Sequence, residues 1–148
     1  NNMEDQLKIK NLVYKYADAV CRRSKKDWAS TWHEEAIWKL PSAPKVEGKD
    51  KIVNFWVEAM SNFPFAAQLI QNGTVEVNGN SASGRWYIVE YLQFADKTGM
   101  FNIGVYQDKY LKVSDEWLFK ERYYNVLYND NGTGNMTGTI NPYPDLID

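Results

Sequence analysis

Residues 71–94 read QNGTVEVNGNSASGRWYIVEYLQF, and two alternating apolar runs meet in this segment at Val77-Asn78-Gly79-Asn80. An Asn-Gly pair between two such runs predicts a β-hairpin with a tight turn. Both faces of the second arm carry apolar side chains, including Trp86 and Ile88 on one face. Because such a strand is typical of a sheet covered on both sides, we expect helices on one face and a second subunit, in a homodimer, on the other.

Helices are predicted upstream of this hairpin. Residues 5–23 place apolar side chains at helical spacing, and Ser24 and Asp27 resemble the ends of a capping box that opens a second short helix. Its buried face is expected to consist of Trp28 and Trp32. Residues 36–40 alternate as a short strand, and residues 48–60 are predicted as a third helix whose apolar face includes Trp56 and Met60.

The other predicted strands extend the sheet. One runs from residue 65 into the hairpin, and two more cover residues 99–113 and 116–128. Gln71 shares its parity with Phe65 and Leu69, so it points inward if that parity faces the core. Residues 129–148 are predicted as a polar loop and an extended C-terminal arm that could cover a cavity mouth. Residues 1–148 are therefore expected to form a single α+β domain.

Charge and composition exclude several classes of function. Lys and Arg number 17 against 19 Asp and Glu, the net charge is -2, and no basic stripe predicts a nucleic-acid partner. No apolar run has the length of a membrane span or marks a signal peptide, so a soluble, cytoplasmic protein is expected. His33 is the sole histidine and Cys21 the sole cysteine. We therefore expect no metal site and no cofactor.

Aromatic residues make up 15% of the chain and occur in every predicted element. Core packing explains this content, because aromatic rings bury large areas. A cavity lined by rings for a flat organic ligand explains it equally well. Both interpretations stay open at the level of sequence.

Several short segments carry a resemblance to a known family. They are Tyr16 eight positions before Ser24, Asp27-Trp28, Glu35-Ala36-Ile37-Trp38, Asn72-Gly73-Thr74, Gly84-Arg85-Trp86-Tyr87, Val105-Tyr106-Gln107-Asp108 and Trp117-Leu118-Phe119. With the order of predicted elements, these segments resemble the SnoaL-like branch of the nuclear transport factor 2-like superfamily, which includes polyketide cyclases, scytalone dehydratase and ketosteroid isomerase. The resemblance implies a cone-shaped α+β barrel, with three N-terminal helices packed in a curved antiparallel sheet, that binds hydrophobic small molecules and dimerises through its outer sheet face.

The resemblance carries over little of the family's catalytic machinery. The Asp and His of the scytalone dehydratase and lindane dehydrochlorinase branch match Ser24 and Gln71 here, and neither of these is a base near neutral pH. Tyr16 resembles the oxyanion-binding tyrosine of ketosteroid isomerase, and the second donor falls near Tyr106. The position of the base in that enzyme falls on Leu40. A pair of donors without its base implies a site for a carbonyl or a phenol.

Glu90 is the one carboxylate that this pattern directs into the cavity. Burial among Trp86, Ile88 and Leu92 would suit a general acid or base, and Tyr16 is the second candidate catalytic residue. An ion pair of Glu90 with Arg122 or Arg85 that only braces the sheet is the structural alternative. Arg122 could also anchor an anionic group of a ligand. The candidate lining residues are Ser24, Trp56, Met60, Gln71, Trp86, Ile88, Tyr106 and Arg122.

Two functions follow as hypotheses. The first is a cofactor-independent lyase, isomerase or cyclase that acts by proton transfer on a hydrophobic polycyclic or aromatic substrate. The second is a ligand carrier or a dimerising scaffold comparable to the small subunit of ring-hydroxylating dioxygenases. A cavity with Glu90 within hydrogen-bonding distance of Tyr16, Gln71 or Tyr106 favours the enzyme, whereas a pocket filled by Trp and Phe side chains favours the scaffold.

Overall fold

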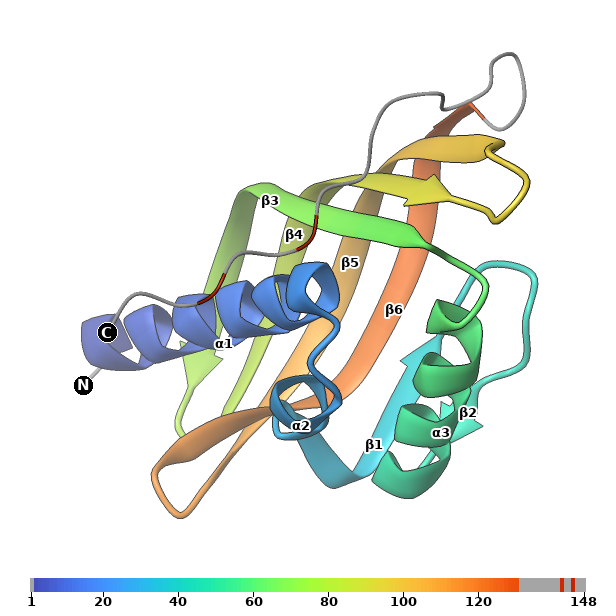
Figure 1. The fold of residues 1–148 in the computed structure, drawn as a ribbon. Helices are drawn as coiled ribbons and strands as arrows, with labels where there is room; N and C mark the ends of the chain where they lie inside the picture. Colours follow the sequence, from blue (N-terminus) through green and yellow to red (C-terminus); the bar gives the residue numbers. More distant parts are fainter. Residues whose placement is uncertain (1, 131–141, 143–144, 146–148) are drawn as a thin grey trace.

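A curved six-stranded sheet forms the frame of the structure, and helices pack on its inner face and beside its β1–β2 edge (Figure 1). The computed structural model describes residues 2–130, 142 and 145. The described elements are α1 (Asn2–Arg22), α2 (Lys25–Ala29), β1 (Trp32–Lys39), β2 (Val46–Glu47), α3 (Lys49–Met60), β3 (Phe65–Asn78), β4 (Ser81–Gln93), β5 (Gly99–Val113) and β6 (Glu116–Asp130). This architecture confirms the predicted α+β class and the arrangement of three helices in a curved sheet.

The strands follow the order β2-β1-β6-β5-β4-β3. Antiparallel pairing joins β3 to β4, β4 to β5 and β5 to β6, as the predicted hairpins require. The turn between β3 and β4 contains Gly79 with φ 65°, a left-handed conformation that glycine adopts at low cost. In contrast to the expected antiparallel sheet, β1 pairs with β6 in the parallel direction.

Helix α1 crosses the inner face of the sheet, while α3 lies beside β1 and β2 (Figure 1). The apolar stripe of α1 is buried, as its helical spacing predicts. Aromatic rings join the three helices to one another: the indoles of Trp28 and Trp56 stack at 4.5 Å, and the ring of Tyr16 lies 5.3 Å from that of Trp28. Core packing therefore accounts for part of the aromatic content.

A bulge in β3 corrects the predicted facing of that strand. The pairing with β4 shifts register between Ile70 and Gly73, so even positions such as Gln68 face inward before the bulge and odd positions such as Val75 face the core after it. Gln71 lies in the bulge and is exposed, so the expectation that it points inward is wrong. A Cβ atom at Gly73 would stand 2.4 Å from the Trp86 ring, so glycine lets this ring approach the bulge.

Two boundaries differ from the prediction. Trp32 was expected on α2, but that helix ends at Ala29 and Trp32 begins β1, where it is still buried against Trp28. Strand β6 continues through Asn129 and Asp130, which were expected in a loop. The rest of the predicted C-terminal arm lies outside the described residues, apart from residues 142 and 145.

Asp5 connects the first turn of α1 to the β5–β6 hairpin. Its Oδ1 accepts a hydrogen bond of 2.9 Å from Trp117 Nε1, and Lys112 Nζ lies 3.0 Å from the same oxygen. The hydrogen bond from Trp117, and then that from Lys112, lower the pKa of Asp5 below its ordinary value of 3.8. Because the pKa is lower in the folded state, the contribution of Asp5 to stability is present above about pH 4 and is lost as the pH falls through the folded-state value.

The Asp5→Asn variant should therefore be less stable than the wild type at pH 7, because it loses the negative charge that Lys112 contacts. The difference in free energy of unfolding should shrink as the pH falls below about 4, where the wild-type carboxylate gains a proton. Urea denaturation at pH 7, 5 and 3 measures this, with the exposed Asp50→Asn as control. An equal difference at all three pH values would contradict the assignment.

Candidate functional site

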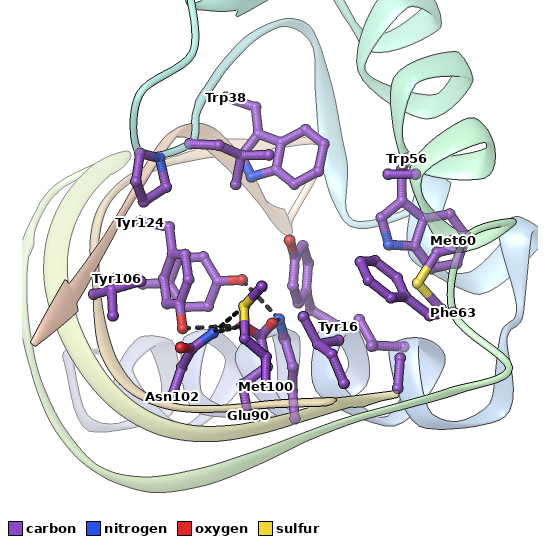
Figure 2. A pocket seen from close by; sticks show the side chains of 18 of the residues that line it. Tyr16, Trp38, Trp56, Met60, Phe63, Glu90, Met100, Asn102, Tyr106 and Tyr124 are labelled. Atoms are coloured by element: carbon purple, nitrogen blue, oxygen red, sulfur yellow. Dashed lines mark hydrogen bonds between the residues drawn. The ribbon is translucent and has the colours of Figure 1, made fainter. Parts of the chain in front are cut away.

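A cavity of about 570 Å³ lies between α1, α3 and the inner face of the sheet. Its walls are mainly apolar and include Trp38, Phe55, Trp56, Met60, Phe63 and Val126. Figure 2 shows Trp56, Met60 and Phe63 on one side of this space, with Glu90, Asn102, Tyr106 and Tyr124 gathered on the other. We call the second group, together with Gln68, the polar end of the cavity. A volume of this size suits a small organic molecule.

The polar end is a consequence of strand register. Gln68 on β3 pairs with Glu90 on β4, Glu90 pairs with Asn102 on β5, and Asn102 pairs with Asn129 on β6. Residues in register on adjacent strands share a face of the sheet, so all four side chains lie in one row. Gln68, Glu90 and Asn102 are buried, and the row crosses an otherwise apolar surface.

Three donors hold the carboxylate of Glu90. Asn102 Nδ2 donates to Oε1 over 3.0 Å, Tyr124 Oη donates to the same oxygen over 3.3 Å, and Gln68 Nε2 donates to Oε2 over 2.9 Å. Figure 2 shows Asn102 and Tyr124 beside Glu90. These are the partners expected of an acceptor-only carboxylate, and they use three of its roughly four acceptor positions. Among the described residues, Glu90 forms no ion pair with a basic side chain.

Gln68 is saturated at one end of its amide and unpaired at the other. Its Nε2 also donates to Tyr106 Oη over 3.0 Å, so both amide protons are used. No described residue donates to its Oε1, although the side chain is only 8% exposed. A buried acceptor without a donor is rare and costly in native proteins, and this oxygen is free to accept a hydrogen bond from a group in the cavity.

The phenols around Glu90 stay protonated and act as donors. Burial, and then the proximity of Glu90, raise the pKa of Tyr124 far above its ordinary value. Burial likewise raises the pKa of Tyr106 and of Tyr16. A Cβ atom at Gly104 would stand 2.3 Å from the Tyr124 ring, so this ring fits only because residue 104 is a glycine without a side chain.

Arg122 lies beneath the polar end and does not line the cavity. Its guanidinium stacks 3.6 Å from the centre of the Tyr106 ring and 4.3 Å from that of Tyr16. Its Nε donates to Asp108 Oδ1 over 2.9 Å, and both side chains of this ion pair are fully buried. Burial lowers the pKa of Arg122, but the charge of Asp108, the neighbouring Tyr106 and Tyr16 and the hydrogen bond to Asp108 together hold the pKa above its ordinary value.

Five of the predicted site residues meet at the cavity. They are Tyr16, Trp56, Met60, Glu90 and Tyr106. The direct contacts of Glu90 differ from the expected ones, because Gln68, Asn102 and Tyr124 hold it and Gln68 connects it to Tyr106.

The other five predicted site residues lie elsewhere. The Ser24 hydroxyl caps α2 by accepting a hydrogen bond from the backbone of Asp27, which ties it to the helix terminus. Gln71 is exposed at the bulge and, with Trp86, lines a different surface depression beside α1. Ile88 lies two residues before Glu90 on β4 and is fully buried in the core. Arg122 pairs with Asp108 instead of Glu90. These four residues and Trp86 do not line the cavity.

Sequence reasoning missed Gln68, Asn102 and Tyr124. Gln68 was missed because the bulge in β3 was not predicted. Without the bulge, the odd positions of the whole strand were expected to face inward, and Gln68 was expected to face outward. Asn102 stands 12 residues from Glu90 and directly opposite it, so counting along two strands from the turn between them would have found this pair.

Within the described residues, no three His, Cys, Asp or Glu side chains are grouped closely enough to hold a metal ion. Likewise, the lining drawn from these residues includes no Lys, Arg or His, so Glu90 is its one formally charged group. In the part of the chain that the structure describes, no helix is both long and apolar enough to cross a membrane.

Comparison with known proteins identifies sequence relatives. The model of the SnoaL-like domain matches residues 1–123. An uncharacterized protein of Mycobacterium tuberculosis, Rv2910c, is 25% identical over 118 residues, which are 78% of this chain and 80% of that protein. A counterpart in Mycobacterium bovis, Mb2934c, matches with the same identity and coverage.

Solved structures share the fold at lower identity. A putative aromatic ring hydroxylase from Novosphingobium aromaticivorans has a TM-score of 0.83 at 22% identity, covering 88% of this chain and 95% of that one. A putative scytalone dehydratase from the same species has a TM-score of 0.81 at 15% identity, with 94% and 97% covered. A hexachlorocyclohexane dehydrochlorinase from Novosphingobium barchaimii has a TM-score of 0.81 at 17% identity, with 93% and 97% covered.

The Arg122→Met variant should lose about 3–5 kcal/mol of unfolding free energy, because it leaves the Asp108 carboxylate buried without its cation. Replacing both partners, as Arg122→Met with Asp108→Leu, should recover much of this loss, since neither charge of the pair is then left buried without its partner. Denaturant unfolding measures both values. Arg85→Met on the exposed surface of β4 is the matched control and should change stability by less than about 1 kcal/mol. A loss at Arg122 no larger than at Arg85 would contradict the proposed importance of the ion pair.

Proposed function

Because the chain belongs to the SnoaL-like domain family, we propose that its cavity binds a flat, largely apolar small molecule and that Glu90 transfers a proton on it. The protein is then a cofactor-independent lyase, isomerase or cyclase. One observation carries this proposal: an ionisable carboxylate is buried at the polar end of a cavity whose other walls are aromatic and aliphatic. Ionisable groups in such clefts are frequent sites of acid–base chemistry.

The geometry supports Glu90 as the group that moves the proton. Asn102 and Tyr124 fix one carboxylate oxygen, and Gln68 fixes the other, so the carboxylate has a single orientation toward the cavity. A catalytic base held in this way needs no reorientation when substrate binds.

The proposed step is balanced without an external reagent. In an isomerisation, Glu90 takes a proton from one carbon, the electrons of the broken C–H bond shift along the substrate, and the same proton returns to a different carbon. In an elimination, those electrons form a new double bond while the leaving group departs with its own bonding pair. Protonated Tyr16 or Tyr106 can donate a hydrogen bond to an oxygen on which negative charge develops.

Two of the similar structures add support by analogy of fold. Their names, scytalone dehydratase and hexachlorocyclohexane dehydrochlorinase, both denote eliminations. Neither reaction, as its name describes it, consumes an oxidant. The analogy concerns the class of reaction, whereas the residues proposed here are those of this chain.

A non-catalytic carrier is the second candidate. The predominance of apolar side chains in the lining favours it, because such walls bind a ligand without acting on it. In that case Glu90 and its donors serve to orient the ligand. A scaffold subunit with a filled interior is less compatible with a cavity of about 570 Å³.

For a compound that the protein converts, Glu90→Gln should lower kcat by at least about a hundredfold, because general acid–base catalysis contributes on that scale. Binding should weaken far less, since glutamine has nearly the same shape. A screen of polycyclic phenols and ketones by thermal shift, followed by single-turnover measurements, provides the substrate and the test. Glu76→Gln, at an exposed position on β3, is the matched control. An unchanged kcat in Glu90→Gln would remove Glu90 from the chemistry and leave the carrier.

We also propose that a second copy of the chain covers the outer face of the sheet. Leu69, Val89, Ile103 and Tyr128 are in register across β3, β4, β5 and β6 and form an apolar row on that face. Leu69, Ile103 and Tyr128 are between 38% and 56% exposed in the isolated chain. An exposed row of this kind is typical of an interface, and a two-fold axis would bury the same row of both subunits.

The Ile103→Lys variant should convert the dimer into a monomer, because it places a charge at the centre of the apolar row. Sedimentation velocity measures the change in mass, and circular dichroism verifies that the fold is retained. Glu58→Lys on the exposed side of α3 is the control and should remain dimeric. A wild-type chain that sediments as a monomer would refute the proposed interface.

A further inference from the structure

We propose that the cavity selects ligands whose polar group is a hydrogen-bond donor, above all a ring hydroxyl group, and holds that group between Gln68 Oε1 and Glu90. The proposal rests on the proposed function and specifies the class of ligand: a flat hydroxylated ring compound in preference to its ether or its carboxylate. It follows from the chemistry of the polar end, where acceptors are left for the ligand and the amide donors are consumed.

The first observation is the unpaired oxygen of Gln68. The side chain lines the cavity, is 8% exposed, and has no described donor for Oε1. Water that enters the cavity can donate to this oxygen, but an apolar ligand expels that water. A bound molecule must therefore donate a hydrogen bond of its own or leave a buried acceptor unpaired.

The second observation fixes the orientation of the Gln68 amide. Its Nε2 lies 2.9 Å from Glu90 Oε2 and 3.0 Å from Tyr106 Oη. Turning the amide over would place Oε1 against an oxygen of the Glu90 carboxylate, where two acceptors repel each other. Glu90 therefore keeps Oε1 of Gln68 available to the ligand.

The third observation concerns the two other side chains that donate to Glu90. The amide of Asn102 donates to Glu90 and accepts from Asn129, and Tyr124 donates to Glu90. Glu90 itself retains an acceptor position beyond its three donors. Beside Gln68 Oε1, a ligand therefore meets a second acceptor. A ligand carboxylate is disfavoured twice, because Glu90 repels it and no Lys, Arg or His of the described residues lines the cavity.

This arrangement also joins recognition to the proposed chemistry. A hydroxyl group held at Gln68 Oε1 places its ring carbons beside the Glu90 carboxylate, because the two residues are direct cross-strand neighbours. The substrate proton that Glu90 takes would then be that of the hydroxyl group or of an adjacent carbon. Orientation and proton transfer depend on the same pair of side chains.

Three naphthalenes with one substituent at the same position test the preference. They are 2-naphthol, which donates, 2-methoxynaphthalene, which only accepts, and 2-naphthoate, which is an anion. Isothermal titration calorimetry at pH 7 should give a Kd for 2-naphthol at least about tenfold lower than for the ether, with the anion weakest. The ether has the larger apolar surface, so hydrophobic burial alone predicts the opposite order.

Two variants test whether the preference for 2-naphthol depends on Gln68 and Glu90. Gln68→Met retains similar length without the acceptor, and the ratio of ether Kd to naphthol Kd should fall toward one. Gln71→Met is the matched control, a second glutamine on β3 that is exposed at the bulge, and it should keep the wild-type ratio. Glu90→Gln should also reduce the ratio, because an amide opposite Gln68 permits both orientations of its side chain.

The outcomes separate this inference from the proposed function. If none of the three compounds binds, the proposal of an apolar ligand cavity fails, and this inference fails with it. If 2-naphthol and 2-methoxynaphthalene bind equally tightly to the wild type, the cavity stands and the donor preference is refuted. A preference that survives in both Gln68→Met and Glu90→Gln, with their folds verified by circular dichroism, would also refute the assignment to these residues.

Discussion

The register of β3, β4 and β5 is the constraint on which the cavity depends. It places Gln68, Glu90 and Asn102 side by side on a concave surface, so that each side chain supplies what its neighbour requires. Shifting any one of these strands by a single residue would turn its member of the row to the outer face. The pairing of the backbone strands therefore determines which side chains of the polar end can form hydrogen bonds with one another.

Beneath that row, the structure separates charge from the space that a ligand would enter. Arg122 and Asp108 neutralise each other below the rings of Tyr16 and Tyr106, whereas Glu90 faces the cavity with neutral partners only. Such a separation leaves one formal charge at the polar end. It also explains why aromatic residues serve two purposes here, since the same tyrosine rings cover the ion pair and line the cavity.

Local patterns predicted the elements well, because alternation, helical spacing and an Asn-Gly turn are properties of contiguous residues. The inward direction of Glu90 followed from parity within β4, a strand whose register with its neighbours is regular at that point. The prediction for Gln71 was wrong because the bulge in β3 reverses which residues face inward. The close packing of Trp86 on Gly73 beside this bulge is a tertiary contact, which local sequence patterns do not indicate. The parallel pairing of β1 with β6 joins segments some 85 residues apart, such as Trp32 and Phe119, and no local signal marks it.

Gly104 shows how a sheet of this kind could acquire new ligand preferences. Tyr124 lies where a Cβ atom at position 104 would be, so the two positions share one volume. A larger residue on β5 then requires a smaller one on β6, and that exchange would replace a phenol above Glu90 by an aliphatic group. Evolution could thus remove one hydrogen-bond donor from Glu90 and make that part of the polar end apolar by two coupled substitutions, without moving the backbone.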